Sequence, residues 1–300
     1  MSDASVSVIV TTFNQRPLVG AAIRSVLAQT YGGVDLIVVD DGSTDDTAAY
    51  LRRRFGGSIR CFRQENGGQG AARNLGLREA RGTHVQFLDA DDLILPEKLA
   101  RQMAVLGGSP ALQAVYCDYA CFVDEPAPDR WTPGIHRDRC LSGNLWPCLI
   151  RGNFLLNHTP VVAIDPVRRV GGFDEDRRLS GCEDYDLWLR LSAAGCRFHY
   201  LDEVLALYRQ VERSVSHDLD GQRRRTIRVL EKVPSYAGEL PRDERSAIDA
   251  YVSRLHAFLC LGALRKRRPW AALRHLTGAL SYDPGIAVQA LRSILRRRQA

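Results

Sequence analysis

Runs of apolar residues and amphipathic stretches follow one another along the first third of the chain. Four short runs have the composition of β-strands, namely residues 6–12, 36–40, 59–63 and 84–88. The first two are apolar or β-branched at nearly every position, which is typical of strands buried on both faces of a sheet. Helical patterns lie between and after the strands, at residues 17–29, from Ser43 onward, at residues 71–80 and at residues 96–106. This alternation predicts an α/β fold with a mostly parallel, doubly wound sheet, and Asn14 is expected to cap the first helix.

The second part of the chain is less regular. The pattern predicts a strand, a proline-containing irregular stretch, a helix and two short strands, at residues 114–123, 124–138, 182–194, 198–201 and 204–209. From about Gln222 the sequence pattern changes and predicts Arg-rich helices. Apolar residues recur three or four positions apart at residues 248–264 and 270–280. We therefore expect two domains, residues 1–220 and a basic helical region over residues 221–300.

Charge is distributed unevenly between these two regions. Residues 1–220 carry 24 Lys and Arg against 29 Asp and Glu, a net charge of −5, whereas residues 221–300 carry 17 against six, a net charge of +11. The basic character of the chain therefore belongs to the C-terminal region. That region has few interleaved aromatic residues and no recognisable nucleic-acid-binding module, so no nucleic-acid partner is predicted.

Composition favours a reduced protein of the cytoplasm. The eight cysteines form no CxxC pair, and 45% hydrophobic and 25% charged residues are ordinary values for a globular chain. No basic segment precedes an apolar stretch at the N-terminus, so we expect no secretory signal. We also expect no segment to reach the roughly 18 to 20 apolar residues needed to span a bilayer.

Acidic residues follow the fourth predicted strand as Asp-Ala-Asp-Asp, at residues 89–92. Ligands of open α/β sheets bind beyond the carboxyl ends of the strands, and clustered carboxylates repel one another unless a cation is present. Hard oxygen ligands near a phosphate suit magnesium or manganese. The alternative is that Asp91 or Asp92 caps the helix that follows. No glycine-rich loop follows the first strand, which argues against a dinucleotide-binding Rossmann protein, a P-loop enzyme or a sugar nucleotidyltransferase.

A second acidic group opens the helix predicted at residues 182–194. Glu183, Asp184 and Asp186 lie in its first turn. Acids at a helix N-terminus are commonly explained by compensation of the helix macrodipole. A functional role is the alternative.

Seven motifs together resemble the inverting glycosyltransferases of family 2, which have the GT-A fold and include enzymes of bacterial cell-surface polysaccharide assembly. The resemblance runs from about Val6 to Ser216, and its motifs occur in the family's order: VSVIVTTFN, VVDDGSTD, NGGQGAARN, FLDADD, GGFDE, EDYDLW and a Tyr-Arg pair at residues 208–209. The fold implied is an α/β GT-A sheet flanked by helices, here with a C-terminal helical appendage. The activity implied is transfer of a sugar from a nucleotide diphosphate sugar, UDP-linked, to an acceptor hydroxyl. A non-catalytic sugar-nucleotide-binding or scaffold module is the alternative.

The resemblance also implies how the donor nucleotide is bound. Thr11 and Phe13 would flank the base, and Asp41 would accept a hydrogen bond from the uracil imide. Arg73 would lie near the base or the diphosphate, and Asp89 would contact the ribose or the shell of the metal. Many relatives have Tyr where Phe13 stands, so stacking is retained and a hydroxyl is lost.

The reacting groups follow from the same resemblance. Asp91 would bind the Mn or Mg ion that bridges the two phosphates, Asp184 would be the catalytic base, and Glu183 beside it would orient the acceptor or donor sugar. Arg209 could add positive charge near the departing diphosphate. Many relatives also have a histidine two residues after the Tyr-Arg pair, where this chain has Val211. The sequence leaves open whether His217 reaches the metal or His158 the acceptor.

The acceptor and the cellular location depend on the C-terminal region. A glycan or a lipid-linked glycan is the expected acceptor. The final helix carries Leu291, Ile294 and Leu295 on one side together with Arg292 and residues 296–298, a pattern suited to the anionic inner face of the cell membrane. A solvated basic face that packs on the catalytic domain or forms a homodimer is the equal alternative.

Overall fold

The computed structural model describes residues 5–123, 132–133, 142–210 and 218–296. It divides into two compact units, Met1–Leu145 with Phe154–Glu212, and Trp146–Asn153 with Arg213–Ala300. Most of the irregular stretch at residues 124–138 and the candidate His217 lie outside the described residues. The assignment of residues 1–220 as the catalytic domain and residues 221–300 as a basic helical region stays a prediction.

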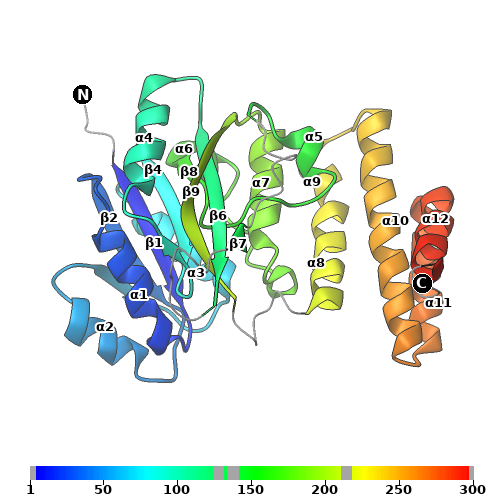
Figure 1. The fold of residues 1–300 in the computed structure, drawn as a ribbon, viewed down its shortest axis with the longest axis horizontal. Helices are drawn as coiled ribbons and strands as arrows, with labels where there is room; N and C mark the ends of the chain where they lie inside the picture. The colour runs from blue at the N-terminus through cyan, green and yellow to red at the C-terminus, as the bar shows by residue number, and fades with distance from the viewer. Residues whose placement is uncertain (1–4, 124–131, 134–141, 211–217, 297–300) are drawn as a thin grey trace. The chain divides into compact units, whose positions relative to one another are not determined.

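The first unit is built on a mixed sheet with the strand order β3-β2-β1-β4-β8-β6-β9-β5, and β7 pairs with β6 at the side (Figure 1). Its strands are β1 (Val6–Thr12), β2 (Val34–Asp40), β3 (Arg60–Arg63), β4 (His84–Asp89), β5 (Leu93–Ile94), β6 (Ala114–Phe122), β7 (Thr132–Pro133), β8 (Val161–Ala163) and β9 (Phe198–Arg209). Strands β1 to β4 are parallel, as predicted. The other half is mixed, because β8 runs antiparallel to both β4 and β6 and β5 runs antiparallel to β9. The predicted class, an α/β sheet flanked by helices, is confirmed.

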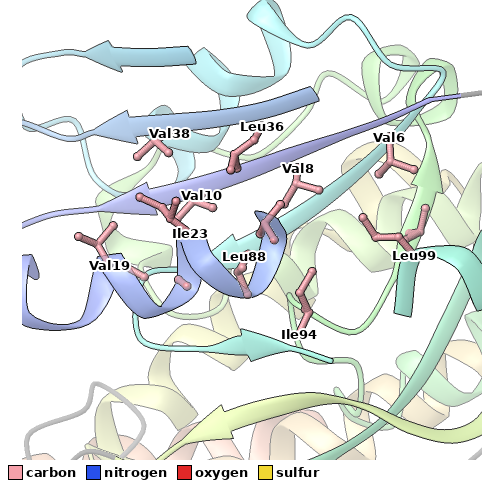
Figure 2. Packing of buried hydrophobic residues seen from close by; sticks show 14 of the residues in the cluster. Val6, Val8, Val10, Val19, Ile23, Leu36, Val38, Leu88, Ile94 and Leu99 are labelled. Atoms are coloured by element: carbon pink, nitrogen blue, oxygen red, sulfur yellow. The ribbon is translucent and has the colours of Figure 1, made fainter. Parts of the chain in front are cut away.

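The core of this unit lies between the parallel strands and the helices that cover them. All seven residues of β1 are buried, which confirms that this strand is covered on both faces. Figure 2 shows Val8 and Val10 of β1 packed beside Val19 and Ile23 of α1 (Arg16–Leu27). Helix α3 (Gln69–Glu79) packs against the same strand. A side-chain carbon added at Gly76 of α3 would collide with Ile9 of β1. Glycine at this position therefore lets α3 lie close against β1.

The remaining helices of the first unit are α2 (Thr47–Phe55), α4 (Lys98–Gly108), α6 (Ile164–Arg169), α7 (Glu183–Ala193) and the 3₁₀ turn η3 (Arg177–Leu179). The predicted helices differ from these by a few residues at their ends, as is usual for frayed termini. The two strands predicted at residues 198–201 and 204–209 are one strand, β9, with a bulge opposite Cys117 and Asp118 of β6. The polar pair Asp202 and Glu203 interrupts the apolar pattern at the bulge, which is why the sequence suggested a break.

The sequence predicted that Asn14 caps the first helix, and this prediction is wrong. Helix α1 begins after Gln15, and Asn14 has a left-handed backbone with φ of 52°. Its side-chain oxygen accepts hydrogen bonds from the backbone N–H groups of Thr44, at 2.7 Å, and Asp45. Asn14 therefore ties the loop after β1 to the loop after β2, at the edge of the sheet where the predicted site lies.

The second unit is helical. Its helices are α5 (Trp146–Leu149), α8 (Leu219–Glu231), α9 (Val233–Ala237), α10 (Arg242–Arg265), α11 (Pro269–Tyr282) and α12 (Pro284–Arg296). The helices predicted at residues 248–264 and 270–280 are thereby confirmed. Small side chains let α10, α11 and α12 pack closely, and the buried cluster contains Ala257, Ala279, Ala287 and Ala290. The side chains of Leu291, Ile294 and Leu295 lie outside the description, so the apolar side proposed for the last helix is untested.

Helix α10 qualifies the expectation that no segment could span a bilayer. By length and composition alone it is long and apolar enough to cross a membrane, with a mean hydropathy of 1.3 in its most apolar window. Its side chains Val252, Leu255 and Leu259 are buried within the protein. Because the core helix of a helical bundle passes the same test, this feature is weak evidence for a membrane span.

Candidate active site

The carboxyl ends of β1, β2 and β4 meet at one edge of the sheet, because the three strands are parallel neighbours. Thr11 is paired in register with Asp89, and Thr12 with Asp40. The hydroxyl of Thr11 lies 3.5 Å from Oδ1 of Asp89. The sheet therefore gathers the polar groups that follow these strands, as expected for a ligand-binding edge.

Asp41, the residue predicted to read the base, is buried and fixed at the end of β2. Its Oδ1 accepts hydrogen bonds from the N–H of Gly67 and the side-chain amide of Gln64, both at 2.8 Å, and its Oδ2 accepts one from the N–H of Gly68 at 2.9 Å. Gly68 has φ of 90°, a conformation that favours glycine. The carboxylate of Asp41 thus holds the turn that leads into α3.

Phe13 lies just past β1, and the residue is 44% exposed, so it is not part of the core. Arg209, at the end of β9, donates from Nε to the backbone oxygen of Asp91 at 2.9 Å, and its guanidinium lies 4.4 Å from the centre of the Phe122 ring. The predicted residue Arg209 is therefore beside the carboxylate segment.

Arg73, on α3, joins two of the acids that the sequence had singled out. Its side chain is buried, and its two terminal nitrogens each lie 2.6 Å from a carboxylate oxygen, one of Asp89 and one of Glu183. Burial alone would lower the pKa of Arg73, but the carboxylates of Asp89 and Glu183 raise it above its ordinary value. The guanidinium also lies 5.2 Å from the centre of the Phe173 ring. Arg73 is thus a fixed cation that links the end of β4 to the start of α7.

The two adjacent acids of α7 have different surroundings. Glu183 is buried, and the oxygen that does not bind Arg73 accepts hydrogen bonds from the N–H groups of Gly181 and Cys182. Asp184 is partly exposed and accepts a hydrogen bond from the N–H of Tyr185 at 2.7 Å. Burial and then the charge of Glu183 raise the pKa of Asp184 to about 7, against the opposing effect of Arg73. Glu183 is therefore an anchor, and Asp184 is the acid suited to exchange a proton.

Asp186, the third acid of this turn, has a structural role. It is buried and pairs with Arg190 one turn later, at 2.7 Å. Arg190 in turn donates to the backbone oxygen of Val170. Macrodipole compensation alone does not account for the acids of this helix, because two of the three have specific arginine partners.

The three acids at residues 89–92 also divide by environment. Asp92 is buried, lies 2.9 Å from Nδ1 of His158 and accepts a hydrogen bond from the N–H of Arg209. In the described part of the chain, the carboxylate of Asp91 has no side-chain hydrogen bond or ion pair. Burial, together with the charges of Asp92 and Asp89, raises the pKa of Asp91 to about 7. The capping interpretation is wrong for both Asp91 and Asp92, because α4 begins after Glu97 and has no side-chain cap.

Asp91 is the acid best suited to a metal ion. Its carboxylate lies among like charges, which a divalent cation would offset. Within the described residues, no group of three or more His, Cys, Asp or Glu side chains converges as a complete metal site. Magnesium and manganese are commonly held by one or two carboxylates together with substrate phosphates. The residues present therefore fit a site that a diphosphate would complete.

The segment that contains Asn157 and His158 is part of this edge, because Asn157 lies 3.5 Å from Asp89 and His158 contacts Asp92. No local sequence pattern predicts these contacts. With its amide oxygen turned toward Arg73, Asn157 accepts hydrogen bonds from Nε and Nη2 at 3.3 Å. His158 binds Asp92 through Nδ1 and stacks on the Tyr208 ring at 6.1 Å. His158 thus faces Asp92 instead of solvent. Its buried Nε2 has no partner within the described residues.

A buried lysine supports this segment from the other side. Lys98 is fully buried and contacts the side-chain oxygens of Gln86 and Gln102. These glutamines donate in turn to the backbone oxygens of His158 and Thr159, each at 2.9 Å. Burial lowers the pKa of Lys98 to about 8. Sequence reasoning missed this network because a lysine in the first turn of a helix is ordinarily exposed.

Comparison with known proteins identifies the family of this chain. The model of the family described as glycosyl transferase family 2 matches residues 7–161, just over half of the chain. An uncharacterized glycosyltransferase of Rickettsia typhi is 33% identical over 196 residues, which cover 62% of this chain and 58% of the relative. One of Nostoc is 40% identical over 114 residues, which cover 37% of this chain and 35% of that relative. The chain thus spans somewhat more than half of the length of the first of these.

Solved structures show the same fold. S. aureus TarS 1–349 in complex with UDP-GlcNAc has a TM-score of 0.72 at 17% identity, covering 97% of this chain and 85% of that one. A mannosyltransferase from Pyrobaculum calidifontis in complex with GDP-Man and Mn²⁺ has a TM-score of 0.62 at 22% identity, covering 97% and 79%. The GT-A fold expected from the motifs is confirmed. The family model, which matches just over half of the chain, shows that this chain belongs to glycosyl transferase family 2.

Proposed function

We propose that this chain is a metal-dependent, inverting glycosyltransferase that transfers a sugar from a UDP-sugar to an acceptor hydroxyl. The observation that carries the proposal is the pair of buried contacts that Arg73 makes with two acids. This cation ties Asp89, at the end of β4, to Glu183, at the start of α7. Asp184, the next residue, is thereby held at the edge of the sheet that also carries Asp91. Arg73 thus links the helix turn that carries the proposed base to the strand end that precedes the proposed metal ligand Asp91.

Asp184 acts as the base. In a single displacement, it takes the proton of the acceptor hydroxyl while that oxygen attacks the anomeric carbon and the bond to the diphosphate breaks. The configuration at the anomeric carbon inverts, and no covalent enzyme intermediate forms. A pKa near 7 suits this task, because such a carboxylate is unprotonated in a useful fraction at neutral pH and still basic enough to accept a proton. Glu183 holds its neighbour in place through Arg73.

The donor binds at the ends of β1 and β2. Phe13 offers an exposed ring for stacking on the base, and Thr11 lies at the end of the same strand. The fixed carboxylate of Asp41 retains capacity to accept a further hydrogen bond, as a uracil N–H requires. Neighbouring structures contain UDP, UDP-GlcNAc or GDP-Man, which supports a nucleotide-sugar donor. The choice of UDP rests on Asp41.

Asp91, with Asp89 nearby, would hold a Mn or Mg ion, which supplies positive charge to the diphosphate leaving group when bound. Arg209, through its contact with the backbone oxygen of Asp91, places a second cation beside this position. We propose that the acceptor is a glycan or lipid-linked glycan of cell-surface polysaccharide assembly, and that the enzyme works in the cytoplasm at the inner face of the membrane.

The alternative is a module that binds a nucleotide sugar without transferring it. The two are separated by measuring thermal stabilisation by a panel of nucleotides with and without manganese, followed by donor turnover. We expect UDP with manganese to raise the melting temperature most, and UDP-sugars to be consumed. Stabilisation without any turnover would favour the binding module. No stabilisation by any nucleotide would contradict both.

A further inference from the structure

The turn between α10 and α11 exposes a group of large apolar side chains. Trp270, the second residue of α11, is 82% exposed. Leu264, near the end of α10, and Leu273, one turn into α11, are 55% and 50% exposed. Figure 1 shows the turn where α10 leads into α11. Several large exposed apolar residues so close in sequence are typical of a surface that contacts another body.

The same turn is strongly basic. Residues 265–268 read Arg-Lys-Arg-Arg, Arg274 follows one turn later, and all of these side chains are exposed. Lys266 is partly neutralised, because its Nζ lies 2.8 Å from Asp220 of α8. No acidic residue occurs between Leu264 and Arg274. The exposed apolar residues therefore lie within a strongly basic segment.

The backbone of the turn is fixed without help from these side chains. The N–H groups of Lys266, Arg267 and Arg268 donate to backbone oxygens in the last turn of α10. Arg267 has φ of 53°, the left-handed conformation that glycine ordinarily supplies after a helix. A non-glycine residue costs some stability in this conformation. Because main-chain bonds hold the turn, the exposed side chains can be replaced without unfolding it.

We propose that the α10–α11 turn, Leu264–Arg274, docks on an anionic bilayer surface. Trp270 inserts at the level of the head groups, with Leu264 and Leu273 beside it, and the arginines face anionic lipid phosphates. A second copy of the chain fits this surface less well, because two basic turns would then face each other. A nucleic acid would match the charge, but it would leave the aliphatic residues exposed. The surface lies within the second unit and does not depend on the proposed transfer reaction.

The test is co-sedimentation of the full chain with vesicles. Vesicles of phosphatidylcholine containing phosphatidylglycerol should carry the protein to the pellet, and vesicles of phosphatidylcholine alone should carry much less. Binding should weaken as salt is raised, because the attraction is screened. Trp270→Ala should weaken binding to the anionic vesicles about tenfold, and Arg265→Gln/Arg267→Gln/Arg268→Gln about a hundredfold.

A matched control is available in the first unit. Arg52, Arg53 and Arg54 of α2 form another exposed run of three arginines, without a neighbouring exposed tryptophan. The triple variant Arg52→Gln/Arg53→Gln/Arg54→Gln changes the net charge by the same amount and should bind nearly as well as the wild type. Melting temperatures of all variants, measured alongside, should stay close to that of the wild type.

Equal losses for the two triple variants would overturn the proposal, because binding would then follow net charge. The proposal would also be overturned if Trp270→Ala and the α10–α11 triple variant, tested separately, both bound anionic vesicles as well as the wild type does. Light scattering separates the other occupants. If Trp270→Ala dissociates an oligomer and leaves vesicle binding unchanged, the surface is an interface between copies. Tighter binding to RNA than to anionic vesicles, lost in the α10–α11 triple variant, would replace the membrane by nucleic acid.

Discussion

Arg73 and Glu183 are 110 residues apart in the chain, and their side chains meet at 2.6 Å in a buried ion pair. The same guanidinium is equally close to Asp89. These two ion pairs connect α3 to the end of β4 and to the start of α7. The position of Asp184, which follows Glu183, therefore depends on an arginine that need not touch the reacting atoms.

Removing the shared cation should be costly. Arg73→Met leaves the carboxylates of Asp89 and Glu183 facing each other without compensation, and we expect the free energy of unfolding to fall by about 3 kcal/mol. Urea unfolding measures this loss. Arg60 is a matched control, because it also joins two acids, Asp35 and Glu79, at a more exposed site. Arg60→Met should cost about 1 kcal/mol or less. Equal losses would show that the buried location of Arg73 has no special importance.

The two adjacent acids of α7 should respond differently to loss of charge. Asp184→Asn should lower kcat by roughly 10² to 10⁴, the usual effect of losing a general base, with little change in nucleotide binding. It should not lower stability at neutral pH, because burial and Glu183 disfavour the ionised form of Asp184. Glu183→Gln should lower stability, because it weakens the contact with Arg73. Steady-state kinetics and thermal unfolding of both variants check this. If Asp184→Asn kept near-normal turnover and Glu183→Gln were stable but inactive, Glu183 would be the base instead of Asp184.

Asp91→Asn should change activity and stability in opposite directions. Transfer should be largely lost, and chelation by EDTA should abolish wild-type transfer until manganese or magnesium is restored. The metal-free chain should become more stable, since the ionised carboxylate is disfavoured by burial and by Asp92 and Asp89. The folded-state pKa is raised, so this gain should be larger at pH 8 than at pH 5. Full turnover of a metal-free preparation would contradict the role of Asp91.

Lys98 predicts a pH dependence of stability. Its folded-state pKa of about 8 lies below the ordinary value, so the folded state releases the proton before the unfolded state does. The buried charge therefore destabilises the fold fully below about pH 8, and the stability of the wild type should rise above that pH. Lys98→Met lacks this group. Urea unfolding at several pH values should show the wild type gaining on the variant between about pH 8 and 10. If stability changed with pH in the same way in both proteins, Lys98 would be accessible to solvent and its pKa would not be lowered.

Sequence patterns predicted most of the sheet correctly, because β1 and β2 are continuous apolar runs. They also placed Asp91 just after β4 and Glu183 and Asp184 at the start of a helix, where the structure has them. They missed β5, β7 and β8, which have only two or three residues each and therefore no period. Strand β7 falls within residues 124–138, which were predicted to be irregular. The sequence patterns also missed the contact between Asp92 and His158, and the support of His158 by Lys98. Such pairings depend on how distant segments are folded together, and no local pattern encodes them.

The configuration of the released sugar tests the central claim most directly. With an α-configured UDP-sugar and no acceptor, water replaces the acceptor hydroxyl, and proton NMR during the first turnovers identifies the anomer before mutarotation. Inversion by a single displacement, with Asp184 as the base, predicts that the β-anomer appears first and that Asp184→Asn slows its release. Early appearance of the α-anomer would contradict the inverting mechanism, and an unchanged rate in Asp184→Asn would contradict the base.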